Sequence, residues 1–237
     1  FVGDTGATKK IRKFTPNVDG TFTEATFVVG GGTYPATPNI QGMTVDHVAG
    51  FIYATDFTAA KVFKIDATSG ASTDFVTATG TGPVGIGLDG NGNVWVALQT
   101  ANQVKKYDSV GAQSLVVGTG TAGYADNAAT AAMFSKPNGL VVIGTTVYVT
   151  DFTNNALRAI ATGDGAVTSI IGAPAVTGSA SFTGLRPGLV KADNTSDASM
   201  LTGAIVRSPL GLTGTTKGDL LLTSGNSVYQ VTAPPAQ

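Results

Sequence analysis

Residues that could do chemistry are few in this sequence. Histidine occurs once, as His47, directly after Asp46. These two residues could form a catalytic pair, but a single histidine cannot make a multi-histidine zinc site. The other candidates are acids at the ends of expected strands: Asp4, Asp56, Asp66, Asp108 and Asp151. An aspartate there commonly accepts hydrogen bonds from the backbone of its own turn, so a turn role is favoured over a metal site.

The segment Asp-Gly-Asn-Gly-Asn at 89–93 resembles the start of a calcium loop. Such a loop alternates oxygen ligands and ends on a glutamate at its twelfth position. Thr100 stands at that position here. A tight hairpin turn that accepts positive φ is therefore the favoured interpretation.

Other catalytic signatures are missing from the sequence. There is no cysteine, which excludes disulfides, thiolate chemistry and iron–sulfur clusters. No Gly-x-Ser-x-Gly motif and no phosphate-binding glycine loop before a helix occurs. We therefore predict no catalytic residue, no metal ligand and no cofactor, and the sequence favours a protein that is not an enzyme.

Composition narrows the class of partner and the compartment. Charged residues make up 12% of the chain and the net charge is −1, which gives no electrostatic reason to bind nucleic acid or an anionic membrane. No apolar run approaches the ~18 residues of a membrane span. The low charge, the lack of cysteine and a first residue other than Met suit an exported protein, so an extracellular or cell-surface location is expected.

The elements that would position these residues are short strands. Between Lys136 and Gly172, four apolar runs rich in Val, Ile, Leu and Tyr are separated by breaks that carry Gly, Asn, Asp or Thr. This pattern predicts a four-stranded antiparallel meander.

The same pattern returns along the chain. A first marker, a strand with a glycine near its start, occurs at 40–46, 83–89, 137–142 and 209–212. A second apolar strand follows each copy, at 51–56, 94–97, 147–151 and 220–223, and a third at 61–66, 103–108, 156–160 and 227–231. Residues 1–4 and 9–14 match only the second and third markers of one further copy.

Because one meander cannot bury both of its faces, copies must stack. The expected fold is all-β: one β-propeller domain over 1–237, with about five four-stranded antiparallel blades. We expect the blades at 1–32, 39–80, 82–117, 136–172 and 208–232, and a long insertion at 173–207 that lies outside the ring and carries contacts. The end blades are expected to be incomplete, since blade one lacks an inner strand and blade five an outer one.

Blade four resembles a known repeat. Gly-Tyr-Ala-Asp-Asn-Ala-Ala-Thr-Ala-Ala-Met-Phe-Ser-Lys-Pro-Asn-Gly-Leu at 123–140, followed by Val-Tyr-Val-Thr-Asp-Phe-Thr-Asn-Asn at 147–155, is similar to the NHL repeat. That repeat has a lead-in rich in Gly and Ala, then Phe-x-x-Pro-x-Gly, and a strand ending in Asp. Blade three departs from it at Ala97-Leu98 and blade five at Ser224-Gly225. The resemblance implies a β-propeller of the secreted microbial type.

Three functions remain open. The first is a secreted structural or protein-interaction module that binds other chains, including copies of itself, in an oligomer or filament. The second is an enzyme of the lactonase or lyase kind with a site at the channel mouth, which rests on architecture alone. The third is a carbohydrate-binding propeller that stacks glycans on Tyr34, Trp95 or Tyr124, although the alternation around Trp95 favours packing.

Overall fold

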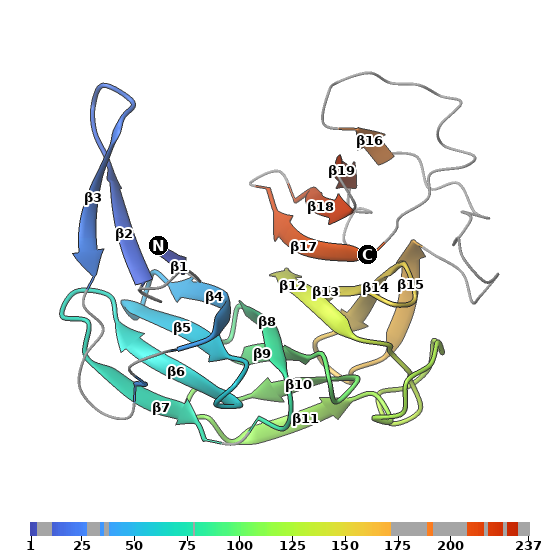
Figure 1. Cartoon of the computed structure of the whole chain (residues 1–237). Coiled ribbons are helices and arrows are strands. Elements are labelled where there is room, and N and C mark those ends of the chain that lie inside the picture. The colour runs from blue at the N-terminus through green and yellow to red at the C-terminus, as the bar shows by residue number, and fades with distance from the viewer. Residues whose placement is uncertain are drawn as a thin grey trace.

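The structure, a computed structural model, describes residues 1–3, 11–27, 34–35, 38–77, 79–171, 189–191, 208–215, 218–224 and 227–231. Every regular element in these residues is a β-strand, and the strands form five antiparallel sheets. The sheets follow one another around an arc, with the first and last sheets on opposite sides of its opening (Figure 1). The all-β propeller architecture expected from the repeated markers is therefore confirmed. The part of the chain that the structure describes contains no helix long and apolar enough to cross a membrane.

Blade one consists of three strands, as the missing first marker implies. They are β1 (Val2–Gly3), β2 (Ile11–Pro16) and β3 (Phe22–Phe27), in the order β1-β2-β3. The turn between β2 and β3 is held by Asp19, whose carboxylate accepts hydrogen bonds from the N–H and the hydroxyl of Thr21.

Blades two to four each have four strands that follow one another from the axis outward. Blade two contains β4 (Ile40–Asp46), β5 (Phe51–Asp56), β6 (Lys61–Asp66) and β7 (Ser72–Val76). Blade three contains β8 (Pro83–Leu88), β9 (Val94–Leu98), β10 (Gln103–Tyr107) and β11 (Gln113–Val117). Blade four contains β12 (Pro137–Ile143), β13 (Thr146–Asp151), β14 (Ala156–Ala161) and β15 (Val167–Ile171).

Blade five differs from the expected three strands. Its sheet has the order β16-β19-β18-β17, built from β17 (Pro209–Gly214), β18 (Leu220–Ser224), β19 (Ser227–Val231) and the earlier β16 (Leu189–Lys191). The outer strand therefore comes from the segment 173–207, which we expected to lie outside the ring. Its three residues pair with Val231, Gln230 and Tyr229. The rest of that expected insertion lies outside the described residues.

The core lies between neighbouring blades. Four apolar clusters fill the four interfaces, and each contains side chains from both of its blades. In the strand of the third marker, which is β2 in blade one, one position always points to the next blade, a direction we call forward. That position is held by Ile11, Val62, Val104 and Leu157, each no more than 1% exposed. Alternation places the position three residues later on the opposite face, toward the preceding blade. There stand Ile65, Tyr107, Ile160 and Val231, which are all buried.

Candidate functional site

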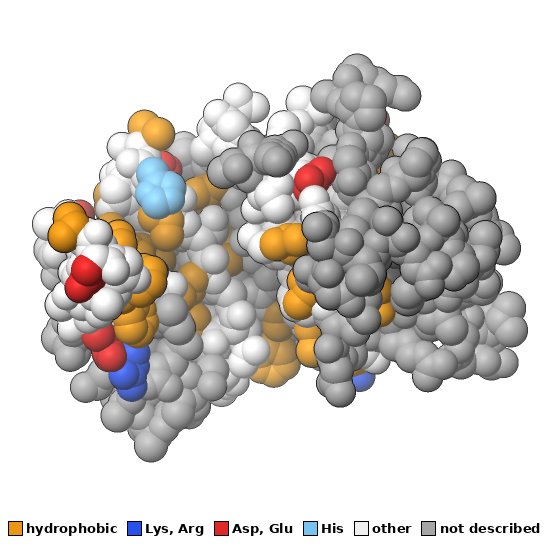
Figure 2. Space-filling view, turned by 90° about the horizontal axis from the view of Figure 1, so that it is seen from above, with side chains coloured by type: hydrophobic (Ala, Val, Ile, Leu, Met, Phe, Trp, Pro, Cys, Tyr) orange, Lys and Arg blue, Asp and Glu red, His pale blue; other side chains and the backbone are white. Residues whose placement is uncertain are grey.

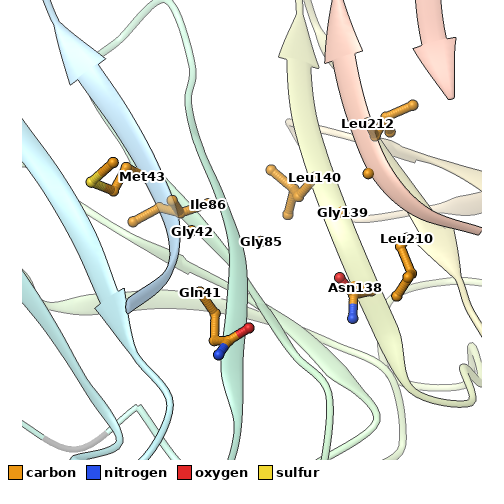
Figure 3. Close-up of a pocket in the computed structure, with 11 residues that line it drawn as sticks. Gln41, Gly42, Met43, Gly85, Ile86, Asn138, Gly139, Leu140, Leu210 and Leu212 are labelled. Carbon is orange, nitrogen blue, oxygen red and sulfur yellow. The ribbon is translucent and has the colours of Figure 1, made fainter. Parts of the chain in front are cut away.

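The inner strands enclose a cavity of about 420 Å³ at the centre of the arc. Each of β4, β8, β12 and β17 contributes a short segment around its marker glycine, namely Gly42, Gly85, Gly139 or Gly211. The residues before the glycines, Gln41, Asn138 and Leu210, lie at one level of the cavity, and Met43, Ile86, Leu140 and Leu212 lie at the next (Figure 3). The described lining is uncharged, and only two side chains in it, Gln41 and Asn138, are polar.

The marker glycines are required because neighbouring inner strands approach one another closely. A Cβ added to Gly42 would lie 2.1 Å from the carbonyl oxygen of Val84. The same atom on Gly85 would lie 2.1 Å from the carbonyl oxygen of Asn138, and on Gly139 it would lie 2.3 Å from that of Leu210. No real side chain tolerates such contacts with backbone. The glycines that reveal the repeat in the sequence are therefore the residues that let the blades converge.

A threonine at the end of the second strand bridges one inner strand to the next. The Thr55 hydroxyl accepts from the N–H of Gly42 and donates to the carbonyl of Val84 in the following blade, at 2.9 and 2.8 Å. Thr150 accepts from Gly139 in the same way and donates to the carbonyl of Leu210, at 2.8 and 3.3 Å. A β-bulge at each of these inner-strand sites turns the acceptor carbonyl away from its own ladder. The bridge is absent in blade three, where Ala97 occupies the position.

Most of the strand-end acids stabilise turns, as predicted. Asp56, Asp66 and Asp108 each accept two backbone hydrogen bonds from residues two to four positions later in the chain. Asp46, which we considered only as a partner of His47, does the same. Asp89 likewise accepts from the N–H groups of Asn91 and Asn93, and from the indole N–H of Trp95. The carboxylate of Asp89 therefore stabilises the hairpin turn between β8 and β9, which confirms the turn interpretation of 89–93. Asp4 lies outside the described residues.

Asp151 is the exception, because it faces a buried arginine. Arg158 on β14 is 0% exposed and its Nη1 donates to Asp151 at 2.9 Å, while Nη2 donates to Asp126 at 2.6 Å. The same guanidinium donates to the carbonyls of Met133 and Ala125. This group, which we call the Arg158 clasp, ties the segment 118–135 to blade four. Burial raises the pKa of Asp151 to about 6, although hydrogen bonds from Asn154, the Ser135 N–H and Arg158 each lower it.

The repeat pattern did not reveal the clasp. Arg158 stands on the backward face of its strand, where blade two has the buried Phe63. Blades one and three also carry a charged residue at this position, Arg12 and Lys105, so the residue type alone did not indicate a buried ionic partner. The aromatic rings of Tyr124 and Phe134 cover the guanidinium.

The structure does not assemble the other chemical candidates into a site. His47 is exposed in the turn after β4, and it is pale blue in the view of Figure 2. Asp46 beside it bonds the turn backbone instead. Among the described residues, no group of three His, Cys, Asp or Glu is placed to hold a metal ion.

The expected sugar-stacking aromatics are engaged in packing. Trp95 is 0% exposed. Tyr34 packs edge-on against Phe63, and Tyr124 covers Arg158 while its hydroxyl bonds Ser169. Trp95 therefore has no exposed surface for a glycan, whereas Tyr34 and Tyr124 are half-buried. Stacking of a glycan on these two rings stays a prediction.

The two ends of the stack leave repeat positions uncovered. Val228 occupies the forward position of blade five and is 40% exposed, whereas its four equivalents are buried. Phe14 occupies the backward position of blade one and is 38% exposed, again against four buried equivalents. Thr223, the equivalent of the buried Thr55 and Thr150, is also exposed. We call these surfaces the blade-five face and the blade-one face.

Comparison with known proteins supports the fold alone. No family model and no curated protein matches this chain, so the NHL resemblance is not confirmed. A virginiamycin B lyase from Staphylococcus aureus superposes with a TM-score of 0.58 at 17% identity, covering 95% of this chain and 61% of the lyase. An auxiliary nutrient binding protein from Bacteroides thetaiotaomicron superposes with a TM-score of 0.63 at 16% identity, covering 88% of this chain and 50% of that protein.

A chain of the nidogen/laminin complex is also similar. Its TM-score is 0.59 at 18% identity, and the match covers 95% of this chain and 86% of that one. This chain spans only 50% to 61% of the length of the two bacterial proteins. The similar proteins thus include a lyase, a binding protein and a member of a protein complex, and they share the β-propeller fold with this chain.

Proposed function

We propose that this chain is a β-propeller interaction module, built from NHL-type repeats, that binds other protein chains including copies of itself, outside the cell or at its surface. The observation that carries the proposal is the exposure of Val228 and Phe14 at positions that every other blade buries. Apolar side chains on the flat face of a sheet favour contact with another protein surface. A location outside the cell is supported by the low charge and the lack of cysteine.

A second candidate function is the binding of a small neutral ligand in the central cavity. The volume of about 420 Å³ lies within the range of ~300–1,000 Å³ typical of ligand pockets. The amides of Gln41 and Asn138 can donate and accept hydrogen bonds, and the apolar level beside them can bury a hydrocarbon group. The described lining residues carry no group that exchanges a proton near neutral pH, which gives the lyase alternative no support from this cavity.

Self-association is tested by light scattering on the purified chain. The expected result is a weight-average molar mass that rises with concentration above the 23.8 kDa of one chain. Added salt should leave this rise unchanged or increase it, because apolar burial drives it and salt screens only charge. A constant mass of one chain at every concentration would contradict the self-association part of the proposal.

A further inference from the structure

We propose that copies of this chain join head to tail, so that the blade-five face of one copy packs on the blade-one face of the next. The inference rests on the proposed function, because it names the partner and the surface through which association occurs. Its central contact joins Val228 of one copy to Phe14 of its neighbour.

The first argument is the pairing seen at every internal interface. In each of the four apolar clusters, a forward residue of one third strand lies with a backward residue of the next. These pairs are Ile11 with Ile65, Val62 with Tyr107, Val104 with Ile160, and Leu157 with Val231. Val228 is the fifth forward residue and Phe14 is the remaining backward one. The pairing seen at the internal interfaces therefore predicts that Val228 of one copy contacts Phe14 of the next copy.

The second argument is the apolar surface that surrounds the two residues. On the blade-one face, Phe22 at the start of β3 pairs with Pro16 at the end of β2, and it is 65% exposed. On blade five, Leu221 lies on the same face of β18 as Thr223 and is half-buried. Covering the exposed parts of Phe14, Phe22 and Val228 favours association, because it removes apolar surface from water. The two faces thus place apolar side chains where the contact would bury them.

Charge on the two faces is compatible with contact. The blade-one face carries Arg12 and Glu24, which form an ion pair at 2.6 Å. The described residues around Val228 on the blade-five face are Thr213, Leu221, Thr223 and Gln230, which are uncharged. The Gln230 amide donates to Asp219 at 2.7 Å, so one acid stands at the edge of this face. Arg12 on the blade-one face carries the opposite charge, and the threonine hydroxyls can bond the rim of the ion pair.

The direction of the contact follows from its two different faces. Every internal interface joins a forward face to a backward face, so two blade-five faces would not repeat any contact in the molecule. The two end blades lie on opposite sides of the opening in one copy (Figure 1). A contact between different faces of successive copies is heterologous, and it propagates into a ring or a filament.

The contact is confined to the outer part of each blade. Blade one has no inner strand among the described residues, so Gly211 and Thr223 have no strand to bridge across this contact. The outer three strands of each blade supply the apolar side chains. The expected association is therefore weaker than the internal interfaces, which add a close inner-strand contact to the apolar packing.

Crosslinking tests the geometry, since the chain has no native cysteine. The variants Phe14→Cys and Val228→Cys are prepared separately, and Val48→Cys, on a turn where the valine is 100% exposed, serves as the matched control. A short bis-maleimide is added to each variant alone and to each pair mixed in equal amounts. All the replaced side chains are at least 38% exposed, so the folds should persist, which the far-UV spectrum and the unfolding midpoint verify.

Head-to-tail association predicts a crosslinked dimer in the mixture of Phe14→Cys and Val228→Cys. Its yield should be at least about tenfold above that of either variant alone and of mixtures with Val48→Cys. The double variant should give a ladder of higher oligomers. A dimer formed by Val228→Cys alone would overturn the head-to-tail arrangement in favour of a two-fold contact. Equal yields in all mixtures would also overturn it.

A charge substitution separates this inference from the proposed function. Val228→Asp should raise the dissociation constant measured by light scattering about tenfold or more, because it would bury an unpaired carboxylate, while Val48→Asp should leave it unchanged. Self-association that persists in Val228→Asp would overturn the proposed contact and leave the interaction module standing. A wild-type chain that stays monomeric would defeat both.

Discussion

At the scale of single residues, two features are central to the structure. Glycines allow the backbone of a neighbouring strand to approach closely, and a network of charged and polar groups holds one arginine in the core. The sequence showed the glycines as markers of the repeat, but not why glycine is required at these positions. At Gly42, Gly85 and Gly139, glycine is required because a neighbouring strand approaches closely, and not because φ is positive. The Arg158 clasp has the opposite character, because it is unique to blade four and no repeat pattern could reveal it.

Replacing Gly85 by alanine tests the close approach. The new methyl group would lie 2.1 Å from the Asn138 carbonyl oxygen, and both strands would have to move apart. We expect the free energy of unfolding to fall by about 3 kcal/mol, as overpacked cores do. Chemical denaturation measures this loss. Gly90→Ala is the control in the same blade, since nothing lies within 4 Å of its Cβ position; an equal loss in both variants would contradict the explanation.

The pKa of Asp151 predicts a dependence of stability on pH. Burial raises the pKa of Asp151 to about 6 in the folded chain, above its ordinary value of 3.8. The folded state therefore binds a proton more tightly than the unfolded state. The stabilisation from this group is complete below about pH 4 and is lost as the pH rises through about 6, with a total change of about 2–3 kcal/mol.

Denaturation of the wild type and of Asp151→Asn between pH 4 and pH 7 measures that change. The amide does not titrate, and the other groups cancel in the difference between the two proteins. The free energy of unfolding of the wild type, relative to the variant, should fall as the pH rises. A difference that stays constant over this range would show that Asp151 keeps an ordinary pKa beside Arg158.

At the scale of elements, the second strand of a blade does more than pair with its neighbours. Its terminal threonine bridges the inner strand of its own blade to that of the next, as Thr55 and Thr150 show. Blade three lacks the hydroxyl because Ala97 replaces the threonine, yet the inner strands still converge at Gly85. The bridge therefore stabilises an arrangement that the glycine makes possible.

Thr55→Val should separate these contributions. Valine keeps the shape but leaves the Gly42 N–H and the Val84 carbonyl without the hydroxyl, so the free energy of unfolding should fall by about 1–3 kcal/mol. The matched variant Thr223→Val changes an exposed hydroxyl that bonds only within its own blade. Its loss in chemical denaturation should stay below about 1 kcal/mol. Comparable losses would place the stabilisation within the blade rather than between blades.

The strands were predicted well where local pattern defines them and poorly where pairing is distant. The second and third markers predicted β5, β6, β9, β10, β13 and β14, because each is an apolar run bounded by a turn. Strand β16 was missed, since Leu189, Val190 and Lys191 are only three residues among Pro and Gly breakers. Their partner is β19, far along the chain. No periodicity in so short a segment could indicate that pairing.

At the scale of the whole molecule, the sequence predicted the architecture but not the candidate site. The repeat requires stacked sheets, and five sheets follow one another around the arc. The cavity lining could not be inferred, because Gln41 and Asn138 come from blades separated by a third. Only the convergence of the inner strands places them around one space. The exposure of Phe14 and Val228 likewise depends on which blade stands at each end.

The close contacts between inner strands also bear on how the number of blades could change in evolution. Each contact places a glycine against a carbonyl of the following strand, and each apolar cluster contains residues of two adjacent blades. A duplicated blade would therefore carry both a forward and a backward face. The blades on either side of it would then pack against faces similar to those they already contact. The number of blades can then vary by copying a segment of the gene, with little adjustment of the neighbouring residues.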